Sequence, residues 1–209
     1  MLKVLKKETT NKNNQLQLFG ADCSINDDVL VIGVVHGDEP QGEILIKKYM
    51  EEYPETKLLF IPCLNPDGRD LGTRVNSKGV DINRNFPTNN WELSEKDNYY
   101  GGKSPASEIE TKFLVDILKK YNIKSILTLH TPYKVVNYDG PAQKLAEDIS
   151  KIINYPVEES IGYPTPGSFG TYVGVERNIP IITLEMDEEE KFESLYPKIK
   201  NIFEYLEKF

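Results

Sequence analysis

Short apolar runs alternate with helical patterns along most of the chain, and this alternation limits the fold more than any other feature. The apolar runs are rich in Val, Ile and Leu, and they predict buried strands at residues 29–35, 58–61, 125–129, 135–138 and 180–184. Apolar residues at helical spacing predict helices at residues 41–52, 108–121, 144–153 and 195–206. Strands that alternate with helices favour an α/β fold, in which a mixed, mostly parallel and twisted sheet carries helices on both faces.

The length of the chain fits one such domain. A chain of 209 residues can bury a sizeable core but leaves little room for a second one. The share of hydrophobic residues, 39%, and of charged residues, 28%, matches an ordinary globular mixture. Because the sequence has neither internal repeats nor a low-complexity linker, we expect a single domain over residues 1–209.

The charge balance and the cysteines indicate a general class of protein. The chain carries 25 basic and 33 acidic residues, a net charge of −8, without a basic stripe. This balance argues against nucleic acid or an anionic membrane as the main partner. No segment has the length of a membrane span or the apolar run of a signal peptide. Because Cys23 and Cys63 form no disulfide framework, we expect free thiols and a cytoplasmic location.

Residues that can bind metal or move protons follow three of the predicted strands directly. His36 comes after residues 29–35, His130 after residues 125–129, and Glu185 after residues 180–184. Glu39 lies three residues beyond His36, on a predicted turn between strand and helix. The carboxyl ends of parallel strands share one edge of a sheet, where ligands bind in α/β folds. We therefore expect these four side chains to lie close together.

Two imidazoles and one carboxylate, with a fourth position open to water, are a ligand set of catalytic zinc sites. A histidine at a strand end is more often an ordinary polar group, and the spacing His-x-x-Glu alone is a weak signal. The zinc motif H-E-x-x-H is absent. However, the chain has only two histidines, and both occupy the same kind of position. This coincidence favours a metal site formed by His36, Glu39 and His130.

A long segment rich in Gly, Pro, Asn and charged residues, residues 65–104, separates the second strand from the second helix. Segments of this length in compact domains usually serve a function. This one contains the motifs NPDG at residues 65–68 and GVDINRNFP at residues 79–87, with Arg74 between them.

These motifs resemble those of the zinc metallocarboxypeptidase superfamily. The resemblance runs in order through nearly the whole chain: HGDE at 36–39, NPDG, GVDINRNFP, LHT at 129–131 and LEMD at 184–187. It implies a carboxypeptidase-like fold and one zinc ion per chain, with His36, Glu39 and His130 as its ligands.

The resemblance also implies the catalytic residues. Glu185 matches the general base, which takes a proton from zinc-bound water and later delivers it to the leaving amine. Arg74 matches the residue that polarises the scissile carbonyl and holds the oxyanion. Alternatively, Glu185 is only the first acid of the run at residues 185–190, and Arg74 is a loop arginine in water.

Three further matches lie in GVDINRNFP. Asn83 and Arg84 match the pair that binds the free carboxylate of the C-terminal substrate residue, as a guanidinium can do through two parallel hydrogen bonds. Asp81 matches the acid that holds one nitrogen of the first zinc histidine, although a turn aspartate also serves as a cap.

Three expectations concern the loops around the site. The residue nearest to the mobile tyrosine of the digestive enzymes is Tyr163, and the residue that matches their specificity position is Phe169. The resemblance also predicts a cis peptide bond between Thr131 and Pro132, since proline makes the cis form inexpensive.

The short length, GVDINRNFP and the segment PTPGSFGTY at residues 164–172 resemble the bacterial murein peptide amidases. This resemblance implies a cytoplasmic enzyme of cell-wall peptide recycling. Its substrate would be a small peptide with a free C-terminal carboxylate, cleaved at the γ-D-Glu–meso-diaminopimelate bond. Diaminopimelate ends in an ammonium and a carboxylate, so its pocket must offer both signs of charge.

Two alternatives stay open. One is an N-acyl amino acid deacylase of the aspartoacylase and succinylglutamate desuccinylase branch. That branch usually has an added C-terminal β domain, whereas this chain ends in a predicted helix soon after Glu185. The other is an inactive module that binds peptidoglycan peptides, which the presence of Glu185 and Arg74 beside the zinc ligands opposes.

Overall fold

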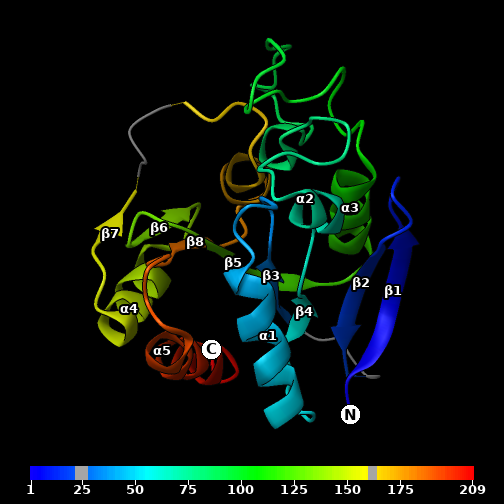
Figure 1. Cartoon of the computed structure of the whole chain (residues 1–209). Helices are drawn as coiled ribbons and strands as arrows, with labels where there is room; N and C mark the ends of the chain where they lie inside the picture. Colours follow the sequence, from blue (N-terminus) through cyan, green and yellow to red (C-terminus); the bar gives the residue numbers. More distant parts are fainter. Residues whose placement is uncertain (22–27, 160–163) are drawn as a thin grey trace.

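The computed structural model describes residues 1–21, 28–159 and 164–209, and its centre is one sheet of eight strands in the order β1-β2-β4-β3-β5-β8-β6-β7 (Figure 1). The strands are β1 (Lys3–Thr9), β2 (Gln15–Gly20), β3 (Asp28–Gly33), β4 (Leu59–Ile61), β5 (Ile123–His130), β6 (Val135–Asp139), β7 (Val157–Glu158) and β8 (Ile181–Glu185). The central strands β4, β3, β5 and β8 run parallel, while β2 pairs antiparallel with β1 and β4, and β6 pairs antiparallel with β8.

Helices cover both faces of the sheet (Figure 1). On one face, α1 (Gln41–Glu52), α4 (Gln143–Ile153) and α5 (Phe192–Leu206) pack against one side of the central strands. On the other face lie α2 (Pro66–Leu71), α3 (Ile109–Lys120), the 3₁₀ turn η1 (Ile82–Arg84) and the π-helical turn η2 (Thr171–Val175). Each face has its own apolar cluster, since alternate residues of β3, such as Val31 and Ile32, point to opposite sides. The central strands are therefore apolar throughout, as parallel strands buried on both faces are.

The predicted α/β class is confirmed. Every predicted strand and helix is present, and their ends differ from the prediction by at most three residues. The most useful difference is that β5 and β8 each end one residue later than predicted, so that His130 and Glu185 are the last residues of their strands. The predicted cis peptide bond between Thr131 and Pro132 is also confirmed.

The hairpin of β1 and β2 is absent from the sequence prediction. β1 is an exposed edge strand with several lysines, so it lacks the apolar run that marks a buried strand. Cys63 is buried as a free thiol, whereas Cys23 lies outside the described residues. No helix in the described part of the chain is both long and apolar enough to cross a membrane.

Candidate active site

The turn that carries His36 and Glu39 begins where β3 ends. Val34 adopts a φ of 52°, a left-handed conformation that is unusual for a β-branched residue and costs on the order of 1–3 kcal/mol. Its carbonyl accepts a hydrogen bond from the backbone N–H of Asn65 at 2.9 Å, which ties the turn to the start of α2. Gly37 packs so closely on Gly68 of NPDG that a Cβ at Gly37 would clash with the Gly68 backbone. The HGDE and NPDG motifs therefore depend on each other for their conformation.

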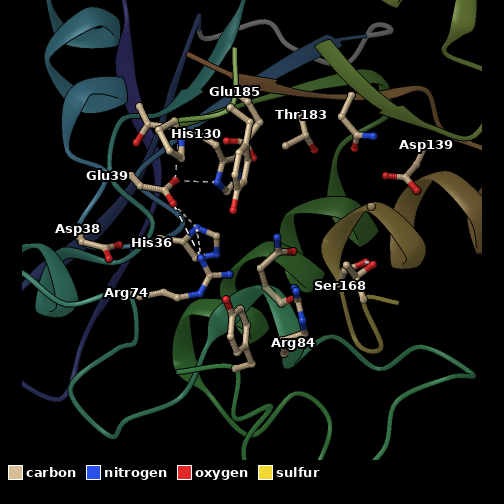
Figure 2. A pocket seen from close by; sticks show the side chains of 18 of the residues that line it. His36, Asp38, Glu39, Arg74, Arg84, His130, Asp139, Ser168, Thr183 and Glu185 are labelled. Carbon is tan, nitrogen blue, oxygen red and sulfur yellow. Dashed lines mark hydrogen bonds and ion pairs between the residues drawn. The ribbon is translucent and has the colours of Figure 1, made fainter. Parts of the chain in front are cut away.

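This turn brings Glu39 between the two histidines (Figure 2). Its Oε1 lies 2.8 Å from Nδ1 of His36, and its Oε2 lies 2.9 Å from Nδ1 of His130. One ligand atom from each of the three residues lies within 4.8 Å of the others, and no second group of this kind occurs in residues 1–21, 28–159 and 164–209. All three side chains are largely or fully buried. The arrangement can hold one metal ion.

The electrostatics of the cluster favour a bound cation. Burial raises the pKa of Glu39, but the two adjacent histidines outweigh burial and hold that pKa well below its usual range. Burial lowers the pKa of His36, yet Glu39 and Asp81 raise it to about 9. Two buried carboxylates thus stabilise positive charge at this point, and a metal ion would supply that charge in place of a proton.

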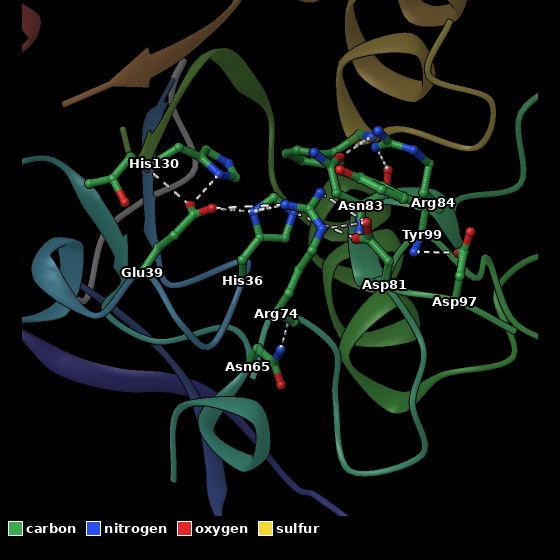
Figure 3. A network of polar contacts seen from close by, with 12 residues as sticks. His36, Glu39, Asn65, Arg74, Asp81, Asn83, Arg84, Asp97, Tyr99 and His130 are labelled. Carbon is green, nitrogen blue, oxygen red and sulfur yellow. Dashed lines mark hydrogen bonds and ion pairs between the residues drawn. The ribbon is translucent and has the colours of Figure 1, made fainter. Parts of the chain in front are cut away.

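A buried network lies directly behind the cluster and is centred on Asp81 (Figure 3). Oδ1 of Asp81 lies 3.5 Å from Nε2 of His36, and Oδ2 accepts hydrogen bonds from Nε and an Nη of Arg74 at 3.0 and 2.9 Å. The second Nη of Arg74 lies 3.3 Å from Nδ1 of His36. Because Asp81 faces Nε2 of His36, the Nδ1 of that ring is left for Glu39 and a metal.

Glu185 stands beside His130, its register partner in the pairing of β5 with β8. It is 8% exposed, and within the described part of the chain its Oε2 has no hydrogen-bond partner. Burial raises the pKa of its carboxyl group, and the negative charge of Glu39 adds to the effect of burial. A carboxylate oxygen that has no partner and faces a cavity can accept a proton from a bound molecule.

Asn83 and Arg84 belong to η1, which Asp81 caps by accepting a hydrogen bond from the Asn83 backbone at 2.9 Å. The side-chain oxygen of Asn83 accepts a hydrogen bond from the Phe169 backbone N–H at 2.9 Å. Its amide NH₂ group is therefore not used in that contact, and the residue lines the cavity. Arg84 donates to the Asn83 carbonyl at 2.8 Å and keeps its other guanidinium donors for a ligand. This pair can bind a carboxylate.

Tyr99 is a residue of the site that the sequence analysis missed. It is 51% exposed, and its ring lies 5.1 Å from the guanidinium carbon of Arg74 and 5.8 Å from that of Arg84. Figure 3 shows it beside both arginines. A cation–π contact of this kind restricts both side chains. No local pattern in the sequence marks Tyr99, because only the path of the loop after η1 brings it here.

One cavity of about 350 Å³ collects these groups, and Figure 2 shows them around its wall. Seven of the eight predicted site residues line it, namely His36, Glu39, Arg74, Asn83, Arg84, His130 and Glu185. Asp81, the eighth, is fully buried behind them. The interpretation of Phe169 as the specificity residue was wrong. Its side chain is buried in the core, with its ring 4.8 Å from that of Phe86, while its neighbours Ser168 and Gly170 line the cavity. Tyr163 lies outside the described residues.

The fold and the site define a class of protein. The profile of the family described as zinc carboxypeptidase matches residues 2–208, and the chain belongs to this family. It is therefore a metallopeptidase-type enzyme, and the family implies zinc as the metal.

The chain is similar to murein peptide amidases and to a gamma-D-glutamyl-diamino acid endopeptidase. Murein peptide amidase A of Vibrio campbellii is 31% identical over 186 residues, which cover 82% of this chain and 74% of that protein. The crystal structure of a murein-tripeptide amidase from Escherichia coli O157 superposes with a TM-score of 0.85 at 26% identity, and the match covers 100% of this chain and 92% of that one. Gamma-D-glutamyl-L-diamino acid endopeptidase 1 of Lysinibacillus sphaericus is 26% identical over 53% of this chain and 38% of its own length.

Proposed function

We propose that this protein is a zinc-dependent amidase that hydrolyses the γ-D-Glu–meso-diaminopimelate bond of the murein tripeptide L-Ala-γ-D-Glu-meso-diaminopimelate. The observation that carries the proposal is that one cavity holds the His36–Glu39–His130 cluster, the carboxylate of Glu185 with its free Oε2, and the guanidinium of Arg84. The similarity to murein peptide amidases and to a γ-D-glutamyl-diamino acid endopeptidase supports the choice of substrate.

The residues of the cluster fit zinc by their chemistry as well as by their spacing. Two imidazole nitrogens and a carboxylate are a known zinc ligand set, and Asp81 on the far nitrogen of His36 fixes which nitrogen faces the metal. We therefore assign His36, Glu39 and His130 as the ligands of one zinc ion. When bound, zinc would polarise the scissile carbonyl and make a water molecule more acidic.

Glu185 is the proposed general base. Its side chain is buried beside His130, and burial raises its pKa, which makes the carboxylate a stronger base than one in water. It would take a proton from the attacking water. The same carboxyl group would then return the proton to the nitrogen of diaminopimelate as the amide C–N bond breaks.

Arg74 is the proposed oxyanion-binding residue. Its Nε and one Nη are held by Asp81, which leaves the second Nη directed toward the cluster at 3.3 Å from His36. A donor that is already held in place stabilises the developing negative charge without reorganisation. Asp81 acts through Arg74 and His36, and it does not touch the substrate.

Asn83 and Arg84 would bind the carboxylate on the reacting centre of diaminopimelate. Arg84 as a whole residue is only 6% exposed, and its side chain lines the cavity. A carboxylate bound to its guanidinium would therefore be partly desolvated. A site that requires this carboxylate next to the scissile bond removes a terminal residue only.

We further propose that residues 1–209 form one catalytic domain, since one family profile spans residues 2–208 and strands from both ends of the chain join one sheet. A cytoplasmic location and a role in cell-wall peptide recycling also stay predictions.

The test is an incubation of the zinc-loaded protein with the murein tripeptide, with N-acetyl-aspartate and with ordinary α-linked peptides, followed by mass spectrometry. We expect free meso-diaminopimelate and L-Ala-D-Glu from the tripeptide alone. Release of aspartate from N-acetyl-aspartate would instead favour the deacylase branch. Binding of the tripeptide without any product would favour the inactive binding module.

A further inference from the structure

The far end of the cavity holds a carboxylate that the proposed reaction does not use. Asp139 is the last residue of β6 and lines the cavity on the side opposite to His36 and Glu39 (Figure 2). Asp139 is half-buried. Within the described residues its carboxylate makes no ion pair or hydrogen bond. Burial raises its pKa, and no neighbouring cation opposes this effect.

The register of two strands fixes how Asp139 relates to the catalytic end. β6 and β8 pair antiparallel, with Val135 opposite Glu185, Asn137 opposite Thr183 and Asp139 opposite Ile181. Side chains two residues apart lie on the same face, so Glu185, Thr183, Asn137 and Asp139 face the same side of the sheet, and all four line the cavity. At about 3.3 Å per residue, the row of Asp139 lies roughly 13 Å along the strands from the row of Glu185.

The local backbone leaves just enough room for this carboxylate. A Cβ at Gly170 would clash with Oδ2 of Asp139, and a Cβ at Gly174 would clash with its Cβ. Gly174 belongs to the π-helical turn η2 and Gly170 precedes it directly, and such turns are frequent at functional sites. The side chain of Asp139 thus packs against glycine backbone on one side, and it lines the cavity.

The two arginines that line the cavity both lie at its catalytic end. Arg74 and Arg84 stand at the end where the scissile bond would lie, together with Glu39 and Glu185, whereas Asp139 stands at the other. Between them, Asn137 donates its amide to the carbonyl of Glu158 at 2.8 Å, which leaves its side-chain oxygen as an acceptor. The far end therefore offers acceptors and negative charge, the chemistry that binds an ammonium group.

We propose that Asp139 determines specificity by binding the distal ammonium of the substrate's C-terminal residue, so that the enzyme selects a diamino acid. This inference rests on the proposed function, because that function places the carboxylate of the same residue at Arg84. A substrate side chain that extended from that position along β8 would bring its distal amine to Asp139.

The experiment compares two peptides that differ only in the distal amine. L-Ala-γ-D-Glu-meso-diaminopimelate carries it, and L-Ala-γ-D-Glu-L-2-aminopimelate keeps every other group. For the wild-type protein we expect kcat/KM to be about a hundredfold higher with the amine, the effect of one desolvated charge-assisted contact. Asp139→Asn should reduce this ratio to within about threefold of unity.

Glu159→Gln is the matched control, since it removes the same charge from an exposed position on the wall of the same cavity. It should preserve the hundredfold ratio to within about threefold, because an exposed charge is screened by water. A ratio that Asp139→Asn leaves intact, or that Glu159→Gln reduces equally, would overturn the inference. So would a general loss of activity on both peptides, which is the result expected of a purely structural role.

Calorimetry with the free amino acids keeps the inference testable if no peptide is cleaved. Wild-type protein should bind meso-diaminopimelate more tightly than L-2-aminopimelate, and Asp139→Asn should bind the two equally. Cleavage of neither peptide would refute the proposed function. Equal binding of both amino acids by the wild type would refute the role of Asp139, whether or not the tripeptide is hydrolysed.

Discussion

Asp81 holds Arg74 by accepting two hydrogen bonds on a single oxygen, and its other oxygen faces the Nε2 of His36. One fully buried carboxylate therefore orients both a proposed zinc ligand and the proposed oxyanion-binding residue. Its neighbours His36 and Arg74 hold the pKa of Asp81 well below its usual range despite burial, so the group stays ionised. The orientation of the proposed zinc ligand and that of the proposed oxyanion-binding residue therefore both depend on Asp81.

We expect Asp81→Asn to weaken zinc binding about 10- to 100-fold and to lower turnover at saturating zinc. Competition against a chromophoric zinc chelator measures the first effect, and steady-state kinetics measure the second. The control is Glu43→Gln, which alters another buried acid that accepts hydrogen bonds from Lys47 and Arg69 outside the cavity. Glu43→Gln should lower stability and leave zinc affinity unchanged. Equal zinc affinity of wild type and Asp81→Asn would contradict the proposed link.

Glu185→Gln should retain zinc and lose about 10³-fold in kcat, because the amide cannot accept the proton of the attacking water. Asp187→Asn is its control, since Asp187 lies two residues further on and forms an ion pair with Lys134 at 2.6 Å. Kinetics with the tripeptide, together with zinc analysis of each variant, separate a chemical defect from a loss of metal. A Glu185→Gln variant with substantial activity would remove Glu185 from the role of base.

Arg84→Lys should lower kcat/KM about 30- to 100-fold on peptides with a free C-terminal carboxylate, because lysine cannot form the paired hydrogen bonds of a guanidinium. The wild type should discriminate strongly against the same peptide as a C-terminal amide, and the variant should discriminate much less. Arg69→Lys, at an arginine that pairs with Glu43 away from the cavity, serves as the control. If Arg84→Lys retained full discrimination, the carboxylate would bind elsewhere.

Glu110 should make stability depend on pH. Its side chain is fully buried near Glu108 and Asn76, and burial raises its pKa to about 7. Because the folded state binds this proton more tightly than the unfolded state, the stabilisation is complete below about pH 4.5 and is lost as pH rises through 7. The loss amounts to about 3–4 kcal/mol in the free energy of unfolding.

Glu110→Gln should abolish this loss, since glutamine stays neutral. Urea unfolding at pH 5 and pH 8 would measure the free energy of unfolding of both proteins. The difference between variant and wild type should be smallest at pH 5, and it should shift in favour of the variant at pH 8. Glu108 is a suitable contrast, because Asn76, Ser107 and Lys78 outweigh its burial and lower its pKa. Glu108→Gln should therefore destabilise the protein at pH 8. Parallel pH profiles of wild type and Glu110→Gln would refute the assignment.

The part of the site that could be predicted from the sequence lies on the central strands. His130 and Glu185 end continuous apolar runs, and such runs mark buried parallel strands whose ends share one edge of the sheet. The motif around Asp81 and Arg84 is short and continuous in sequence, so these residues could be identified without knowledge of the tertiary structure. These features were sufficient for the fold class and for the cluster of candidate ligands.

The rest depends on contacts between distant segments. Tyr99 reaches the two arginines only because Asn85 holds the loop after η1 through the carbonyls of Gly101 and Ser104. Asp139 faces the cavity only because β6 pairs with β8 in one particular register, which no local pattern specifies. For Phe169 the sequence predicted a cavity residue that the structure does not place there. Its ring packs in the core beside that of Phe86.

The most direct test of the account is the zinc content of the purified protein after supplementation, measured by plasma mass spectrometry beside His130→Ala. The three ligands proposed here predict about one zinc per wild-type chain, and a content near zero for His130→Ala after dialysis. Wild-type protein with much less than one zinc per chain would contradict the assignment of His36, Glu39 and His130, and so would His130→Ala that retained a full equivalent.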